Sequence, residues 1–483
     1  MMRTRAGTCM LCWLATLACL PLHEPLAAEP PIMQARNGPN DTAGGPVRDL
    51  TLLQAWQASL QHDPGYLAAI SEREAGQANR GIGRAGLLPQ VSASLGRSKL
   101  RGTLETPGPL GRVRDEDLNY TIKTSEIRAT QTLFNWSRYA EYRQGQARAD
   151  HSLAVFDTKA TDTATRLFNR YFQALLAHEN IVLARNKLQA DETLRMAAQR
   201  RYDNGEGTIT DIRQAAARRD LSRADLIAAR DTMVVAQREL QEMVGPSPLR
   251  LAALKPDFQP QALSPPSLAQ WQSAALKDSS AIHSGEQALR VAADEVDRSF
   301  GGHLPTLDLV AARRFASNET IATRYQDSNT TEIGIQVTLP IYSGGLTSAL
   351  VDQAKHNRDR AVQELAAARE RTAVEVSKQY HAVVSGAERI RALIVAEESG
   401  TQALRAVEAG FGAGTHSMVD ILDTQDRLYQ SRLDLAQARL EYVLARLMLS
   451  AAAGGLDAPT IRQASEQYFG NDRVALQPPP VKF

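Results

Sequence analysis

Cysteine, aromatic residues and long apolar runs are all scarce in this sequence. The three cysteines of the 483-residue chain are Cys9, Cys12 and Cys19, so the remainder offers no disulfide and no thiol chemistry. No stretch after Leu22 has the ~18 consecutive apolar residues of a transmembrane helix. Aromatic residues make up 5% of the chain and charged residues 23%. This composition favours long helices packed on one another over one thick globular core.

Signals of an enzyme are missing as well. The chain contains no Gly-x-x-x-x-Gly-Lys phosphate loop, no Gly-x-Ser-x-Gly nucleophile elbow and no His-Glu-x-x-His metal motif. The formal net charge is +1, so no field that attracts polyanions is expected. We therefore expect a protein that is not an enzyme, holds no cofactor or metal ion and binds no nucleic acid.

Residues 1–28 are typical of a secretory signal peptide. Arg3 and Arg5 give a positive start, and the apolar segment from Met10 to Leu22 is too short to span a bilayer comfortably. Small residues at Ala27 and Ala28 offer a cleavage point. The mature chain then begins in residues 29–48, whose Pro, Gly and Asn content predicts a flexible leader.

An alternative reading of the start concerns Cys19. The segment from Thr16 to Cys19 loosely resembles a bacterial lipoprotein box, although Thr16 stands where leucine is usual. In that case Cys19 is lipidated and becomes the N-terminus.

One stretch of the sequence occurs twice. Residues Tyr202 to Ile212 match Phe411 to Ile421, about 209 residues later (411 minus 202), without a gap. In each copy glycine lets the chain leave one long helical pattern, and Thr208 or Ser417 caps the next, with an aspartate three residues on. The pattern predicts two helical hairpins of the same design and an internal two-fold repeat.

The remainder of the chain follows the same plan in both halves. Each half reads as short helices, two strands with period-two alternation, one very long helix, a turn and a second long helix. We expect repeat one at 49–250, with strands at 88–101 and 118–134 and a helical hairpin at 137–245. After a Pro-rich linker at 251–266 we expect repeat two at 267–455, with strands at 304–316 and 330–340 and a helical hairpin at 345–453. A loosely ordered tail at 456–483 is expected to follow.

Two strand hairpins per chain set a physical constraint. Four strands cannot close a barrel, since the smallest known have about eight. An open edge in lipid leaves backbone groups unpaired, at several kcal/mol each, so strands that span a membrane must be pooled among several chains. Helices of about 67 residues reach roughly 100 Å, several times the thickness of a bilayer, and must project into water.

In its sequence pattern the chain resembles the TolC-like family of bacterial outer-membrane efflux and secretion ducts. The resemblance is carried by the duplicated plan, the Leu-Pro pairs before strands, the segment Thr338 to Tyr342 and above all the block from Gly410 to Asp423. It covers roughly residues 49 to 455 and implies a mainly α fold with a transmembrane β-barrel. The family's fold is a homotrimer, whose 12-stranded barrel takes four strands from each chain and stands on a long α-helical periplasmic tunnel.

The resemblance also implies a function and partners. Such proteins are passive exits in the outer membrane, extending into the periplasm, and they work with a periplasmic adaptor and an inner-membrane transporter. That transporter is an ABC exporter in type I protein secretion or a proton-driven pump in multidrug efflux, and the sequence leaves this choice open. The alternative is a soluble periplasmic coiled-coil adaptor or scaffold, which would not extract with outer-membrane lipid.

Asp420 and Asp423 are the candidate gate. They lie three residues apart and share a helix face opposite the apolar seam of Met418, Ile421 and Leu422. In the family that this chain resembles, the matching aspartates ring the narrow periplasmic entrance. For Asp420 a capping box with Ser417 is a structural alternative, and Asp423 lies past the cap position.

Four further residues match the family's latch between neighbouring coils: Thr210 and Asp211 in the first turn, and Phe411 and His416 in the second. The family commonly has tyrosine where Phe411 stands and arginine where His416 stands. We therefore expect a weaker latch that depends on pH, in which protonated His416 pairs with Asp211. A solvated histidine in the turn is the alternative.

Aromatic residues at strand ends are candidates for the membrane interface. Tyr120, Trp136 and Tyr342 are placed where such anchors occur, and packing between helices is an equal alternative.

Overall fold

The computed structural model describes residues 47–107, 111, 113–247, 249–256, 258–317 and 326–476. Residues 1–28 with Cys19, the leader up to residue 46 and the last seven residues of the expected tail lie outside this part. Val47 to Phe483 is one compact unit. Among the helices of the described ranges, none carries the apolar length needed to cross a bilayer.

The first half of the chain runs from a short strand into helices, a long β-hairpin and a helical hairpin. Its elements are β1 (Arg48–Leu50), α1 (Leu52–His62), α2 (Pro64–Gln77), α3 (Asn79–Ala85), β2 (Gln90–Pro107), β3 (Val113–Phe134), α4 (Trp136–Asp203) and α5 (Ile209–Val244).

The second half repeats much of this order and adds two elements at its end. Its elements are β4 (Leu249–Leu254), α6 (Leu268–Asp278), α7 (Ser280–Phe300), the 3-10 turn η2 (Gly301–His303), β5 (Thr306–Ser317), β6 (Asp327–Thr338), α8 (Leu346–Gly412), α9 (Met418–Ala452), α10 (Ala458–Tyr468) and β7 (Phe469–Ala475).

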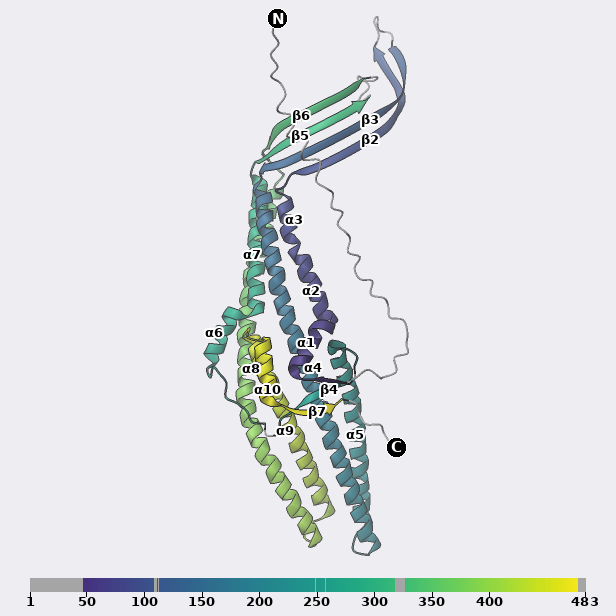
Figure 1. Ribbon diagram of the computed structural model, residues 1–483, viewed down its shortest axis with the longest axis vertical. Coiled ribbons are helices and arrows are strands. Elements are labelled where there is room, and N and C mark those ends of the chain that lie inside the picture. The colour runs from purple at the N-terminus through teal and green to yellow at the C-terminus, as the bar shows by residue number, and fades with distance from the viewer. Residues whose placement is uncertain are drawn as a thin grey trace, which may run out of the picture. The chain divides into compact units, whose positions relative to one another are not determined.

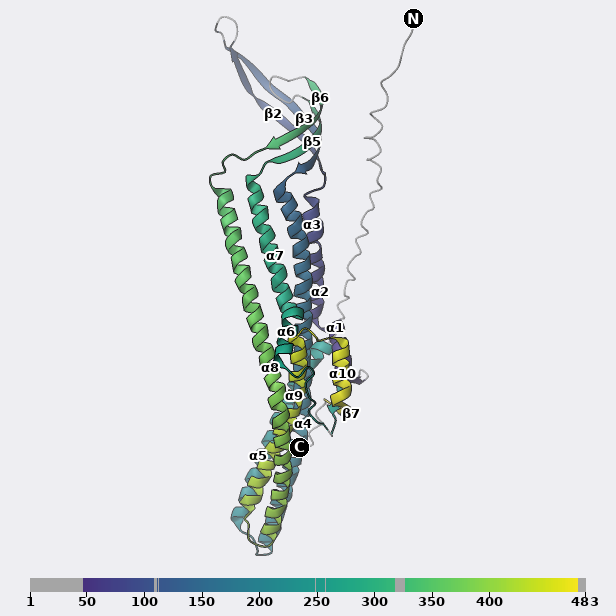
Figure 2. The same cartoon turned by 90° about the vertical axis from the view of Figure 1, so that its left-hand side faces the viewer.

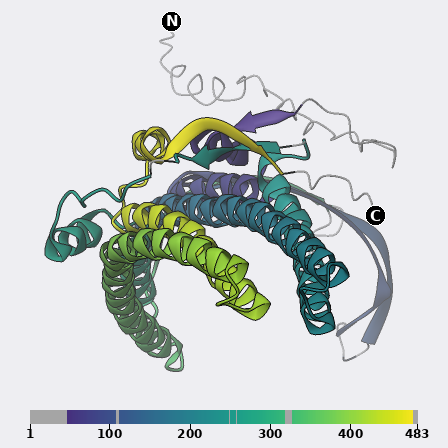
Figure 3. The ribbon, with the colours of Figure 1, turned by 90° about the horizontal axis from the view of Figure 1, so that it is seen from below.

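Two helical hairpins dominate the unit. Helices α4 and α8 have 68 and 67 residues, which at 1.5 Å per residue is roughly 100 Å each. Helix α5 returns along α4 and α9 returns along α8, while α4 also contacts α9 (Figures 1 and 2). Seen from below, both hairpins bend (Figure 3). The four-stranded sheet lies at the end of the helices that is remote from the two hairpin turns (Figure 1).

The four strands β2, β3, β5 and β6 form one antiparallel sheet in that order. β2 and β3 have 18 and 22 residues, against 12 in each of β5 and β6, so the first hairpin extends beyond the second (Figure 1). The strands are longer than expected in the first hairpin, because Gly102 and the charged residues before Leu118 continue the ladder instead of forming a loop. Both β2 and β6 are edges of this sheet.

Strand register separates the sheet into two different faces. Residues directly opposite each other point to the same side, so Val91, Ala129 and Ala311 share a face. We call this side the apolar face; its large members are exposed, and they are Val91, Leu95, Ile127, Leu309, Phe315, Ile333, Ile335 and Val337. The intervening residues give the polar face, with Ser92, Ser94, Glu126, Arg128, Glu332 and Gln336. Nothing else in the described unit covers the apolar face, which is the pattern of a sheet made for lipid.

A second sheet corrects three expectations from the sequence. β1, β4 and β7 pair in the order β1-β4-β7, so the expected linker at 251–266 begins inside a strand. The expected loose tail contains α10 and β7, whose Ile461 and Phe469 are buried. The last leader residue, Arg48, also begins β1. The proline content suggested a linker, but pairing partners about 200 residues away decide the structure here.

Tyr171 ties helix α4 to this small sheet. Its side chain is 0% exposed, and its hydroxyl donates to the Leu50 carbonyl and accepts from the Ala252 N–H, both at 3.2 Å. Burial raises the pKa of Tyr171 above its ordinary value, so the hydroxyl keeps its proton. The contact fixes the middle of the helical hairpin against both β1 and β4.

We expect Tyr171→Phe to lower the free energy of unfolding by about 1–3 kcal/mol, because the buried Ala252 N–H loses its acceptor. Urea unfolding of the detergent-solubilised protein, followed by circular dichroism, measures this. The control is Tyr139→Phe, since Tyr139 is 46% exposed. Equal midpoints for the two variants would show that the Tyr171 hydroxyl adds no stability.

Candidate functional site

The two helical turns at the lower end of the unit share one backbone geometry. Gly205 and Gly414 both have φ of 77°, the left-handed region that favours glycine. The Glu206 N–H donates to the Arg201 carbonyl at 2.8 Å, and the Thr415 N–H donates to the Gly410 carbonyl at 2.9 Å. Each feature recurs at the spacing of the two sequence copies.

Both turns also start the returning helix with a full capping box. The Asp211 N–H donates to Thr208 Oγ1 at 3.2 Å, and the Asp420 N–H donates to Ser417 Oγ at 3.2 Å. In return each carboxylate accepts from the backbone N–H of the cap residue. Asp211 and Asp420 are therefore structural caps in this chain, as the sequence allowed for Asp420.

His416 faces Asp420 in the second turn. His416 Nδ1 lies 3.6 Å from Asp420 Oδ2, with side chains 45% and 50% exposed. The backbone N–H and the hydroxyl of Ser417, followed by His416, lower the pKa of Asp420 below its ordinary value. Within one chain His416 thus lies beside Asp420 of its own turn, and a pair with Asp211 of the first turn is not seen among the described residues. The expected latch between neighbouring coils stays a prediction.

The second candidate aspartate has a different partner. Arg218 of α5 donates through Nη2 to Asp423 Oδ1 at 2.8 Å and through Nη1 to Asp426, so one guanidinium bridges two carboxylates of α9. Lys187 of α4 lies 3.0 Å from Asp426 and 3.4 Å from Asp225. The contacts of Arg218 and Lys187 with α9 join the first helical hairpin to the second.

A buried carboxylate extends this connection. Asp191 of α4 is 2% exposed; it accepts from the Ser222 hydroxyl of α5 and from Gln425 Nε2 of α9, the latter at 3.2 Å. Burial raises the pKa of Asp191, an effect that the Ser222 hydrogen bond and the nearby Lys187 charge oppose. We call Lys187, Asp191, Arg218, Asp423 and Asp426 the hairpin network.

Apolar packing joins the hairpins nearer the turns. Ala198 and Ala215 of the first hairpin form one buried cluster with Met418 and Leu422 of the second. Phe411 packs against this cluster, and the Arg201 guanidinium lies 4.4 Å from the centre of its ring. A cation–π contact across the hairpins thus stands at the position where the family commonly has tyrosine.

The sequence-predicted site residues divide into two groups. Asp420, Asp423, Phe411 and His416 all lie near the second turn, while Thr210 and Asp211 lie at the first, where Thr210 is exposed. Roles as gate and latch stay predictions. Arg218 and Lys187 were not predicted from the sequence, in which the spacing of Asp423 and Asp426 on one helix face is the only local sign of this network.

The structure corrects one of the three interfacial aromatics. Tyr120 is 7% exposed, and its register opposite Leu100 places it on the side away from the apolar face. Tyr342, which is 87% exposed, and Trp136 lie where the sheet meets the helices; the Trp136 ring is tilted against that of Tyr139, with ring centres 5.8 Å apart. For these two residues the interfacial role stays a prediction.

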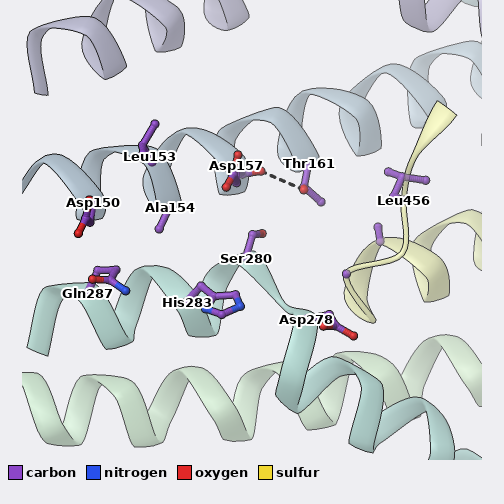
Figure 4. A pocket seen from close by; sticks show the side chains of 12 residues that line it. Asp150, Leu153, Ala154, Asp157, Thr161, Asp278, Ser280, His283, Gln287 and Leu456 are labelled. Atoms are coloured by element: carbon purple, nitrogen blue, oxygen red, sulfur yellow. Dashed lines mark hydrogen bonds between the residues drawn. The ribbon is translucent and has the colours of Figure 1, made fainter. Parts of the chain in front are cut away.

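A cavity of about 400 Å³ lies between α4, α7 and the chain that follows α9, further from the two hairpin turns than the hairpin network (Figure 4). Asp150, which lines it, lies 2.8 Å from Arg80, and the Thr161 hydroxyl donates to the Asp157 carbonyl at 3.0 Å. No group of three or more His, Cys, Asp or Glu side chains able to hold a metal ion occurs in the described part of the chain.

A positive charge on His416 is expected to reduce the flow of cations past the second turn. Asp420 has a lowered pKa and keeps its negative charge from pH 5.5 to 8, and histidine is the side chain that gains charge towards the acidic end of this range. A charged imidazole 3.6 Å from Asp420 offsets that carboxylate, so we expect single-channel conductance in planar bilayers to be lower at pH 5.5 than at pH 8. His416→Ala should remove this difference in conductance. The control His356→Ala, near the start of α8, should leave it unchanged. Equal pH dependence in wild type and His416→Ala would refute a role for His416.

Comparison with known proteins identifies the family. Residues 55–246 and 271–455 match the model of the family described as outer membrane efflux protein. The chain belongs to this TolC-like family. Its members are channels of the outer membrane, so the protein is an outer-membrane exit duct that extends into the periplasm, and the soluble adaptor considered from the sequence is wrong.

Individual relatives agree with this assignment. The chain is 32% identical over 429 residues to the alkaline protease secretion protein AprF of Pseudomonas aeruginosa, covering 88% of this chain and 89% of AprF. It is 31% identical over 436 residues to the proteases secretion protein PrtF of Dickeya chrysanthemi, covering 88% and 93%. The outer membrane protein VceC of Vibrio cholerae has the same fold, with a TM-score of 0.71 at 16% identity over 84% of this chain and 97% of VceC.

Proposed function

We propose that this outer-membrane efflux protein is the passive exit duct of a type I protein secretion system and works as a homotrimer. The observation that carries the proposal is a sheet of four strands with two free edges and an exposed apolar face, standing on two helical hairpins. Such a sheet is incomplete in lipid, and identical neighbours complete it.

The free edges argue for closure with other copies of the chain. β2 and β6 end the sheet on opposite sides, and each presents a row of backbone donors and acceptors. In hydrocarbon each unpaired group costs several kcal/mol, so β2 of one chain is expected to pair with β6 of the next. Three chains then give a barrel of 12 strands, with the helical hairpins extending below it as a tunnel.

The lower turns form the proposed gate of that tunnel. With three chains, Asp420 and Asp423 contribute six carboxylates, which attract cations and repel one another. Arg218 bonds Asp423 within the chain, which lowers this repulsion and holds the hairpins together. The duct opens when the hairpins of each chain separate, and Thr210, Asp211, Phe411 and His416 modulate this step as the latch.

AprF and PrtF, which are 32% and 31% identical over 88% of this chain, carry names of protease secretion proteins, whereas the outer membrane efflux protein BepC of Brucella suis is 31% identical over 62% of it. This supports a polypeptide as cargo and, as partners, an ABC exporter with a periplasmic adaptor. Drug efflux with a proton-driven pump is the other use of the same duct.

The proposal is tested in a strain that lacks its own outer-membrane duct. The full chain is produced together with a protease exporter and its adaptor, and secreted protease is measured in the medium. We expect protease export to be restored only when the chain is present. If the chain instead restores drug resistance with a proton-driven pump and exports no protease, the secretion role is wrong.

A further inference from the structure

The apolar face changes character along the first β-hairpin. Beyond Leu95 the same side of β2 carries Arg97, Lys99 and Arg101, because alternate residues share a face. Register pairs Arg97 with Lys123 of β3, which therefore points to this side as well. We call these four residues the basic row.

None of the four finds an acidic partner in the chain as described. All are exposed, and no ion pair involves them among the described residues, whereas Arg128 on the polar face lies 3.0 Å from Glu126. Arg97 and Lys123 are even directly opposed, an arrangement of like charges that destabilises a strand pair. The acids of this face, Glu105, Asp115 and Asp117, lie further along the hairpin towards its tip.

The basic row lies where the lipid changes from hydrocarbon to headgroup. On β5 the apolar face runs from Leu307 to Phe315, about 26 Å of strand and roughly 20 Å along the membrane normal at the ~40° tilt of barrel strands. One exposed basic residue, Arg313 opposite Ile127, interrupts it near its far end. Phe315 shares its cross-strand row with Leu95, and Arg97 and Lys123 form the next row on that face. Arg97 to Arg101 then covers about 10 Å more, against a headgroup layer of roughly 5–8 Å.

The two ends of the apolar face differ. Near the helices it ends at Phe134 and, beyond β6, at Tyr342, without a comparable basic cluster. The basic row follows the row of Leu95 and Phe315, on its side away from the strand ends that join the helices. Since the helices extend into the periplasm, this end belongs to the outer leaflet.

We propose that the basic row binds the phosphate groups of lipids in the outer leaflet, a phosphorylated glycolipid being the chemistry that fits best. This rests on the proposed function, because it needs the sheet to span the membrane. Guanidinium groups bind phosphate with paired, charge-assisted hydrogen bonds, and lysine adds point charge. A phosphate between Arg97 and Lys123 turns their repulsion into two attractions, so the lipid anchors the sheet at a fixed depth.

The test uses the full chain, purified as its oligomer in neutral detergent. Bisphosphorylated lipid A and its dephosphorylated form are titrated, and bound copies are counted by native mass spectrometry. We expect at least a tenfold preference for the phosphorylated lipid in wild type. The combined variant Arg97→Gln/Lys99→Gln/Arg101→Gln/Lys123→Gln should lose that preference, and Arg97→Lys/Arg101→Lys should retain it.

Arg128→Gln, on the polar face, is the matched control and should bind like wild type. If the combined variant does not assemble, Lys99→Gln/Lys123→Gln gives the same comparison with less change. Equal preference in wild type and variant overturns the lipid site and leaves the duct intact, as does binding of inorganic phosphate alone at the same concentration. A wild-type chain that forms no oligomer in the outer membrane overturns the proposed assembly, and the lipid site with it.

Discussion

Ile335→Arg should abolish most of the assembled protein in the outer membrane. Ile335 is 67% exposed on the apolar face of β6, between Ile333 and Val337. An arginine on the lipid side of a barrel costs up to about 2–4 kcal/mol, the upper value applying at the bilayer midplane, and a trimer carries three copies. The measurement is the amount of heat-sensitive oligomer on a gel of the outer-membrane fraction.

The neighbouring residue supplies the control. Gln336 points to the polar face, so Gln336→Arg should assemble like wild type and change only ion selectivity. If both variants assemble equally well, the apolar face does not contact lipid. If both fail equally, the two sides of β6 are not different environments.

Arg218→Ala should open the duct. Arg218 connects α5 to Asp423 and Asp426 of α9, and its loss leaves these acids and the buried Asp191 with Lys187 as the nearest cation of the network. The pairs are partly exposed, so about 1 kcal/mol per chain is expected, which shifts an open-to-closed ratio about fivefold per chain. Single-channel conductance in planar bilayers should rise several-fold.

Arg213→Ala is the matched control, because Arg213 lies on the same helix, is exposed and forms no ion pair among the described residues. It should leave conductance unchanged. Asp426→Asn combined with Arg218→Ala should open the duct less than the two single effects added together, since both changes break the same contact. An Arg218→Ala duct with wild-type conductance would show that the network does not hold the hairpins.

Local features of this fold were accessible from the sequence. Each helical turn is built within about ten residues, so glycine followed by Thr208 or Ser417 was enough to predict a cap, and Asp211 and Asp420 complete it. The alternation of Ile333, Ile335 and Val337 likewise predicted a strand with one apolar face, and the register agrees.

Contacts between distant segments were not accessible. Arg218 and Asp423 are 205 residues apart, and no periodicity indicates which seam of α5 meets α9. The same holds for β1, β4 and β7, where Leu249 and Leu251 are buried by a sheet that three separate segments build. The prediction for Tyr120 was wrong for a related reason. The side of the sheet to which Tyr120 points depends on the register of β3 with β2, which alternation alone does not fix.

The central claim is that β2 of one chain pairs with β6 of another. Within one chain β3 and β5 separate these edges by roughly 14 Å, beyond the reach of a disulfide. All three native cysteines lie in residues 1–28, the expected signal segment, so Ser94→Cys can be combined in turn with Thr330→Cys, Glu332→Cys, Gly334→Cys or Gln336→Cys. The account predicts that oxidation in intact outer membranes gives covalent dimers and trimers for at least one pair. Monomers alone, for every pair tested, would contradict it.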